Sequence, residues 1–328
     1  MMSRRSGEPP GIGRWSGLWR KMVLPAASVI TVVTGVPGAV ALTGARSQAL
    51  DAYSVSAVAT TAEPTQSVTP PAPDPKVATV AFSTSARAKL TRKLGAYLKD
   101  RSGQASVQIH DLSTGITYGY NTGLRTVTAS IVKVDILAAL LLRAQRDSRS
   151  ITATERNLAK LMITLSDNDA ATTLWNQIGG APGLATANRK LGLRDTTPGP
   201  GGYWGSTTTG AADQIRILRS LTSKTSPLNA ESRRYILGLM ADVAPAQAWG
   251  ISAAAGNDDT TAVKNGWLSR TADGGRWTIN SIGRIHGDGH DYLIAVISRR
   301  NSSMADGIAT VEHIAELAIK ALNSNPAP

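Results

Sequence analysis

The stretch Ser130-Ile131-Val132-Lys133 opens a long, mostly apolar run that continues to Leu142. A run of this kind predicts a buried helix. Residues three apart share one helix face, so Ser130 and Lys133 would lie together in its first turn. A lysine that is partly desolvated and near other cations can be neutral enough to take the proton of a serine hydroxyl. The helix N-terminus adds unpaired N–H groups that favour a developing oxyanion.

Two short polar motifs follow along the chain, Ser166-Asp167-Asn168 and Lys264-Asn265-Gly266. Taken alone, the first is typical of a capped helix start, because Asp and Asn both cap helices well. Ser-x-x-Lys alone also occurs in many unrelated proteins. The order and spacing of all three motifs are far more specific. Together they resemble the class A β-lactamases and the penicillin-binding D,D-peptidases, over roughly residues 80 to 328.

The resemblance implies catalytic roles for four side chains. Ser130 would attack a carbonyl group and become acylated, with Lys133 as the base. Ser166 would pass a proton to the leaving nitrogen, assisted by Lys264, which would also attract a substrate carboxylate.

The resemblance further implies substrate binding by Asn168, Asn265, Gly266 and Trp267. Asn168 would orient Lys133 and the acyl side chain, and the backbone N–H groups of Ser130 and Trp267 would hold the oxyanion. Asn265 stands where the family usually has Thr or Ser, and it can still hydrogen-bond a carboxylate. The indole of Trp267 either alters the shape of the substrate pocket or is an ordinary tryptophan of a folded strand.

One family feature is missing. Class A β-lactamases carry a Glu that activates the water releasing the acyl group, but here no Glu occurs between Glu155 and Glu231. The corresponding loop, residues 193–209, is rich in glycine and proline. Its only acid, Asp195, could serve as a base or could fix a turn with Arg194.

Tyr203 and Trp204 of the same loop could form a wall of the substrate pocket. Loss of a general base commonly costs about 10²–10⁴-fold in rate. The sequence therefore predicts that an acyl group forms on Ser130 and leaves slowly.

The N-terminal quarter predicts export. A basic leader precedes residues 22–45, which carry no charge, and Ala39-Val40-Ala41 offers a cleavage site. We therefore expect residues 1–45 to be a signal peptide or a membrane anchor. Residues 46–80, rich in Pro, Ala, Thr and Ser, predict a disordered linker. Residues 81–328 would form the enzyme domain, in a secreted or membrane-anchored, extracytoplasmic protein.

The expected fold class is α/β, more narrowly α+β. Periodicity predicts a helix over 85–99, strands over 105–109 and 116–120, a mostly helical middle, three late strands and a closing helix. The two chain ends would then build one antiparallel sheet lobe around an inserted all-helical lobe. That layout is implied by the β-lactamase/transpeptidase resemblance, and the strand predictions agree with it.

The composition limits which cofactors, metals and binding partners we expect. The 328 residues contain no cysteine, which excludes a disulfide, a thiolate metal site and a cysteine-linked lipid within them. His286 and His290 flank a glycine-rich stretch that predicts a turn between strands rather than a metal site. The net charge is +12, but no basic run interleaved with aromatics indicates nucleic-acid binding. We expect no cofactor, no metal and a monomer.

Three functions fit these residues. The first is a β-lactamase-like serine hydrolase acting on β-lactams. The second is a D,D-peptidase or esterase acting on cell-wall peptides. The third is a non-catalytic cell-wall binding module on the same fold, against which the full set of four polar side chains argues.

Overall fold

The computed structural model describes residues 82–287 and 289–324. The predicted export segment, 1–45, and the predicted linker, 46–80, lie outside the described residues and stay predictions. No helix in the described part of the chain has both the length and the apolarity that crossing a bilayer requires.

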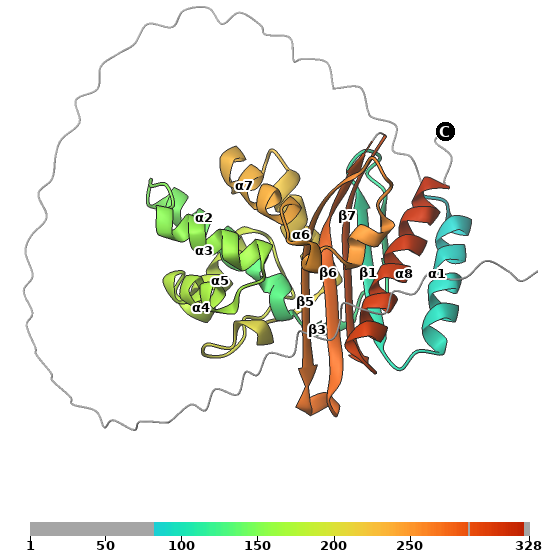
Figure 1. The fold of residues 1–328 in the computed structure, drawn as a ribbon. Coiled ribbons are helices and arrows are strands. Elements are labelled where there is room, and N and C mark those ends of the chain that lie inside the picture. Colours follow the sequence, from blue (N-terminus) through green and yellow to red (C-terminus); the bar gives the residue numbers. More distant parts are fainter. Residues whose placement is uncertain (1–81, 288, 325–328) are drawn as a thin grey trace, which may run out of the picture. The chain divides into compact units, whose positions relative to one another are not determined.

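The centre of the fold is a five-stranded antiparallel sheet of order β2-β1-β7-β6-β5 (Figure 1). Its strands are β1 (Gln104–Asp111), β2 (Thr117–Tyr120), β5 (Thr260–Arg270), β6 (Arg276–Gly287) and β7 (His290–Asn301). Strand β1 pairs with β7 over its whole length. Both ends of the domain therefore build one sheet, which confirms the predicted fold class.

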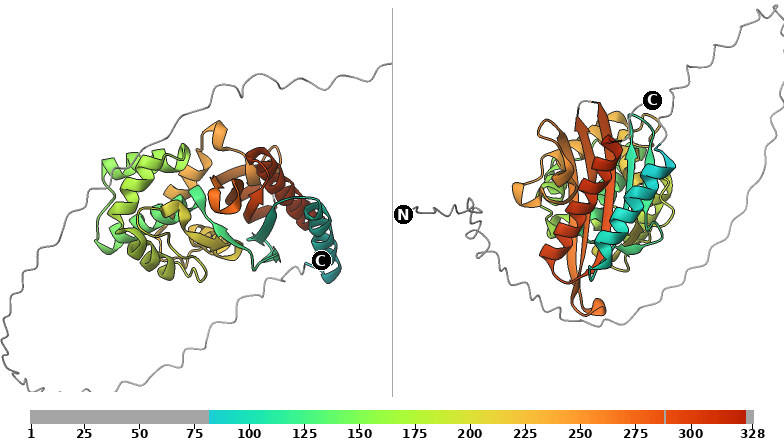
Figure 2. Two further views of the ribbon diagram at one scale, coloured as in Figure 1. Left: turned by 90° about the horizontal axis from the view of Figure 1, so that it is seen from below. Right: turned by 90° about the vertical axis from the view of Figure 1, so that its right-hand side faces the viewer.

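Two helices cover one face of the sheet. They are α1 (Thr84–Lys99) and α8 (Met304–Asn323), which lie side by side in front of it in the right-hand view of Figure 2. Each begins at a serine, Ser83 or Ser303, whose hydroxyl accepts a hydrogen bond from a backbone N–H of the first turn. Their apolar sides and the facing side chains of the sheet form one continuous core.

The inserted helical lobe covers the other face. Its helices are α2 (Val132–Arg146), α3 (Ala153–Thr164), α4 (Asn168–Gln177), α5 (Gly180–Lys190), α6 (Ala211–Thr222) and α7 (Ala230–Ala241). Its core is continuous with sheet residues Ile282, Leu293 and Ile297. Helix α3 begins with a capping box, in which the Thr152 hydroxyl and the Glu155 carboxylate each accept a backbone N–H of the other residue.

Several short elements were not predicted from the sequence pattern. They are the paired strands β3 (Arg125–Val127) and β4 (Thr208–Gly210), and the 3₁₀ turns η2 (Ala129–Ile131), η3 (Trp204–Ser206), η4 (Pro245–Gln247) and η5 (Gly250–Ala254). A further 3₁₀ turn, η6 (Thr271–Asp273), lies in the hairpin between β5 and β6. Ser130 thus lies on η2, immediately before α2, and not in the first turn of the helix itself.

Helix α2 is the hub of the helical lobe. Every residue from Val132 to Leu142 is buried, as the apolar run predicted. One of them, Asp135, is a fully buried carboxyl whose two oxygens have no hydrogen-bond partner. Burial, reinforced by the nearby charge of Asp213, raises the pKa of Asp135 to about 8. At neutral pH this carboxyl is therefore mostly protonated.

Replacing Asp135 with Asn should change how stability depends on pH. The pKa of the carboxyl is about 8 in the folded chain and about 3.9 in an unfolded one. Between these values the unfolded state releases a proton that the native state keeps, so this group lowers stability as the pH rises. The slope is about 1.4 kcal/mol per pH unit. Urea unfolding from about pH 5 to about pH 8 measures it. Parallel curves for the wild type and Asp135→Asn would contradict the assignment.

Candidate active site

Ser130 is the one residue between Thr126 and Leu142 that is not buried. The residue before it, Ala129, has a φ of +46°, in the left-handed region that alanine rarely adopts. Such strain costs about 1–3 kcal/mol and persists only where surrounding contacts enforce it. The backbone turn therefore holds Ser130 at the surface of an otherwise closed segment.

The three residues of the motif at 166–168 make different contacts. The Asp167 carboxylate accepts the backbone N–H of Ala170 at 2.7 Å and caps α4. Ser166, with a φ of +57°, is also held in the left-handed region. Capping by Asp167 alone leaves the side chains of Ser166 and Asn168 for another partner, which is Lys133.

Lys133 lies at the junction of the motifs. Its amine donates to the Ser166 carbonyl at 2.6 Å, to Asn168 Oδ1 at 2.8 Å and to Ser166 Oγ at 3.2 Å. The amine of Lys264, from strand β5, donates to the same Ser166 Oγ at 3.0 Å and to the Asn265 carbonyl at 3.0 Å. The structure thus joins three of the four predicted catalytic side chains through one hydroxyl.

Both lysine amines have lowered pKa values. Burial lowers the pKa of Lys133 to about 7, against a smaller opposing effect of the Asp167 charge. Burial, and then the charge of Lys133, lowers the pKa of Lys264 well below its ordinary value. A lysine with a pKa near 7 is partly neutral at physiological pH and can accept a proton.

Gly266 lets strand β5 approach the turn that carries Ser130. A Cβ on Gly266 would lie 2.7 Å from the Ser130 backbone nitrogen, 2.7 Å from the Thr128 carbonyl oxygen and 2.8 Å from the Ile131 nitrogen. Only glycine fits this approach. Strand β5 is also the edge of the sheet next to the helical lobe. Every second residue of β5 therefore points its backbone N–H away from the sheet, where no strand pairs with it.

Asn280, which the sequence pattern did not single out, fixes the same turn to the sheet. Its buried amide donates to the Val127 carbonyl at 2.9 Å and the Thr128 carbonyl at 3.0 Å. Its Oδ1 accepts the N–H of Ser298 at 3.2 Å. No local signal marks this residue, because its partners are more than 150 residues earlier in the chain.

The side chains of Asn265 and Trp267 lie on the other face of strand β5, since strand side chains alternate. The buried amide of Asn265 donates to the Gln247 and Trp249 carbonyls at 2.8 and 2.7 Å. It braces the segment before η5, a task different from the predicted contact with a substrate carboxylate. Trp267 packs edge-on against Trp249, with ring centroids 5.7 Å apart. This packing is what is expected of a tryptophan in a folded strand.

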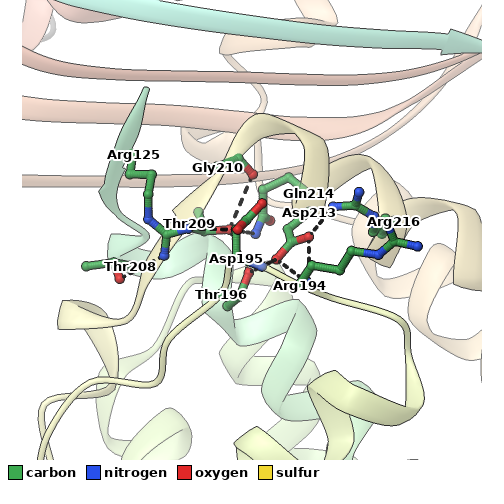
Figure 3. A network of polar contacts seen from close by, with 10 residues as sticks. All are labelled: Arg125, Arg194, Asp195, Thr196, Thr208, Thr209, Gly210, Asp213, Gln214 and Arg216. Carbon is green, nitrogen blue, oxygen red and sulfur yellow. Dashed lines mark hydrogen bonds and ion pairs between the residues drawn. The ribbon is translucent and has the colours of Figure 1, made fainter. Parts of the chain in front are cut away.

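The acid of the loop at residues 193–209 belongs to a separate network (Figure 3). Asp195 forms its ion pair with Arg125 Nη1, at 3.6 Å, and not with Arg194. The backbone N–H groups of Arg194 and Asp195 and the Thr196 hydroxyl donate to the buried carboxylate of Asp213, in α6.

Burial alone would raise the pKa of Asp213, but these hydrogen bonds and the one from Arg216 hold it below its ordinary value. A charged Asp213 therefore ties the start of the loop to the helical lobe. Asp195 takes part in this anchoring contact, and the described hydrogen bonds of Lys133 include no carboxylate.

His286 and His290 lie at the adjoining ends of β6 and β7, in agreement with the predicted turn between strands. Among residues 82–287 and 289–324, no group of three or more His, Asp or Glu side chains is placed to hold a metal ion.

A known protein family matches the part of the chain that contains these residues. A family model described as "Beta-lactamase enzyme family" matches residues 89–154 and 144–322. This chain belongs to that family. The match covers the sheet, the helical lobe and all three motifs.

Curated relatives of this β-lactamase family member are named "Putative lipoprotein LppW". They come from Mycobacterium tuberculosis (strain ATCC 25618 / H37Rv) and Mycobacterium bovis (strain ATCC BAA-935 / AF2122/97). Each is 28% identical over 211 residues, 63% of this chain and 66% of the relative. The aligned part thus spans slightly less than two thirds of the relatives' length.

Solved structures share the fold. A class A β-lactamase from Bacteroides cellulosilyticus DSM 14838 superposes with a TM-score of 0.64 at 18% identity, covering 73% of this chain and 99% of that one. A mutant of PBP-A, solved as an acyl-enzyme complex with penicillin G, gives a TM-score of 0.62 at 19% identity, covering 73% and 97%. At these identities the likeness establishes the fold.

Gly266→Ala should destabilise the protein. The added methyl group would meet fixed backbone atoms of Thr128 and Ser130 at 2.7 Å, and such overpacking typically costs about 1–3 kcal/mol. Gly205→Ala is the matched control, because its nearest contact would be an ordinary 3.9 Å to the Ala129 Cα. The free energy of unfolding in urea measures both. Equal stability of the two variants would show that β5 does not approach the turn as described.

Proposed function

We propose that this chain is a serine hydrolase that forms an acyl-enzyme at Ser130 with β-lactams or related amides and releases the acyl group slowly. The observation that carries the proposal is the Ser166 hydroxyl, which lies between the amines of Lys133 and Lys264 at 3.2 and 3.0 Å. Two amines with lowered pKa values donate to this one hydroxyl, and one of them, Lys133, comes one helical turn after Ser130, so the three groups can form a relay for proton transfer.

In the acylation step, Ser130 Oγ bonds to the carbonyl carbon of the substrate while its proton passes to the neutral amine of Lys133. Negative charge develops on the carbonyl oxygen. The N–H of Ser130 and, by the family resemblance, the N–H of Trp267 on the free edge of β5 would stabilise that charge.

The bond from the carbonyl carbon to the amide nitrogen then breaks. Ser166 gives its proton to the departing nitrogen and recovers one from Lys133, which returns to its neutral form. Lys264 stabilises Ser166 during this exchange and attracts the carboxylate of the substrate. Asn168, which accepts a hydrogen bond from Lys133, would contact the acyl side chain. The products are an ester on Ser130 and a free amine, and no proton is gained or lost.

Slow release follows from what surrounds Lys133. Hydrolysis of the ester requires a water molecule that loses its proton as it attacks. The described hydrogen-bond partners of Lys133 are Ser166 and Asn168, and Asp195 is engaged with Arg125. Without a carboxylate at this point, the acyl group should persist on Ser130.

We further propose that the enzyme acts outside the cytoplasm, as a secreted or membrane-anchored protein. The basic leader and the uncharged segment at 22–45 support this, as does the name lipoprotein given to its mycobacterial relatives. The 328 residues contain no cysteine, so attachment through the uncharged segment fits this sequence better than a cysteine-linked lipid does.

Incubation with penicillin should produce a covalent adduct on Ser130 that accumulates. Mass spectrometry of the intact protein and of its peptides measures the adduct and its position. Ser130→Ala should abolish it while leaving the far-UV circular dichroism unchanged. Rapid turnover without an adduct would contradict slow release, and absence of both adduct and hydrolysis would contradict the proposed acylation.

The same variant separates the alternative functions. Release of terminal alanine from a peptidoglycan pentapeptide by the wild type, but not by Ser130→Ala, would identify a D,D-peptidase. Binding of wall fragments that survives in Ser130→Ala, with no covalent labelling of the wild type, would identify a binding module.

The rate of adduct formation should rise with pH and level off above about pH 7. Only the neutral amine of Lys133 can take the serine proton, and burial lowers its pKa to about 7. Stopped-flow or quench measurements of the acylation rate from about pH 5 to about pH 9 would give this profile. Lys133→Arg, whose guanidinium stays charged, should acylate slowly at every pH. A rate that falls as pH rises through about 7 would exclude Lys133 as the base.

A further inference from the structure

The indole ring of Trp204 lies over the amine of Lys133, in addition to the residues that hydrogen-bond this amine. The Lys133 Nζ lies 4.8 Å from the centroid of the Trp204 ring. Ser166 and Asn168 contact the same amine through hydrogen bonds, so the indole forms an apolar part of its surroundings. Lys133 is fully buried although Ser130, Ser166 and Asn168 are not.

The indole is held on both sides. Its Nε1 donates to the hydroxyl of Thr172, in α4, at 3.1 Å. Its backbone belongs to η3, and the Thr207 carbonyl just beyond η3 accepts the N–H of Thr128 at 2.7 Å. The loop is therefore bonded to the turn that carries Ser130, and Thr172 fixes the outer edge of the ring.

A tight fold of the loop makes this placement possible. Residues Thr197 and Thr208 form an isolated antiparallel bridge, and the Gly199 N–H donates to the Thr207 hydroxyl at 3.0 Å. A Cβ on Gly199 would lie 2.1 Å from the Tyr203 carbonyl oxygen. The glycines and prolines that shorten this loop thus bring Trp204 down onto Lys133.

We propose that Trp204 is a positioning residue that seals Lys133 from water, and that the bond to Thr172 keeps it in place. The seal keeps Lys133 neutral for acylation and keeps a water molecule away from the ester that follows. Hydrolysis would need water oxygen to bond to the acyl carbon, the ester bond to Ser130 Oγ to break, and a proton to return to Oγ. Both consequences for catalysis rest on the proposed function, whereas the seal itself and its effect on the pKa of Lys133 do not.

The charged groups around Lys133 are few. Asp167, at the start of α4, favours the charged amine, and Lys264, on β5, opposes it. The face of an indole also favours a cation, while exclusion of water disfavours one. Because burial is the larger effect at Lys133, removal of the ring should admit water and raise the pKa of the amine.

The first test measures that pKa without any substrate. The full-length protein, labelled with carbon-13 at the lysine Cε, is titrated by NMR, and Lys133→Ala assigns the signal. Trp204→Ala should raise the pKa of Lys133 by about one unit or more, Thr172→Val should raise it less, and Trp204→Phe should nearly preserve it. Trp277→Ala, on the far side of the sheet, is the matched control and should leave it unchanged. An unchanged pKa in both Trp204→Ala and Thr172→Val would overturn the proposal.

The second test uses the penicillin adduct. Its lifetime should shorten about threefold or more in Trp204→Ala and less in Trp204→Phe, because water then reaches the ester. An equal lifetime in Trp204→Ala and the wild type would overturn the water-exclusion part. Failure of the wild type to form an adduct would instead refute the proposed function, and the NMR titration would still decide whether Trp204 seals Lys133.

Discussion

The hydroxyl of Ser166 receives hydrogen bonds from two buried lysine amines, and this contact sets the demands on the structure around it. A buried ammonium group without partners is very costly, and two close together are costlier still. The protein meets this cost by supplying acceptors, the Ser166 carbonyl, Asn168 Oδ1 and the Asn265 carbonyl, and by letting the pKa of both amines fall. The lowered pKa values on which the proposed mechanism depends are thus a consequence of burying the two amines.

Three distant segments must meet for this contact to exist. Lys133 comes from the hub helix of the helical lobe, Ser166 from the turn before α4, and Lys264 from the edge strand of the sheet. The edge strand can reach the helical lobe because Gly266 has no side chain, and Asn280 ties the turn before Ser130 to the next strand. Two residues of these motif segments, Ala129 and Ser166, have backbones in the left-handed region. Their strain is the local cost of presenting hydroxyl groups from closely packed backbone.

The loop at residues 193–209 contains no glutamate and is held by contacts of its own. Its one acid is used with Arg125, and its start is bound by the charged Asp213. Its apolar residue Trp204 lies over the amine that acts as the proposed base. The face of an indole attracts a cation, but the ring also excludes water, which disfavours one, and burial is the larger effect at Lys133. In the proposed mechanism, these dry surroundings would favour acylation and slow the release of the acyl group.

The sequence by itself indicated the main helices and strands and the three motifs, because periodicity and motif order can be read along the chain. The two-lobed layout was implied by the family resemblance that those motifs carry. The resemblance implied that Asn168 orients Lys133, and the structure shows that amine bonded to both Asn168 and Ser166. Only the tertiary structure decided the face of β5 on which Asn265 and Trp267 lie, the contribution of Asn280 and the position of Trp204. Each of these depends on a residue far along the chain, and a local pattern carries no information about which distant surface will pack against it.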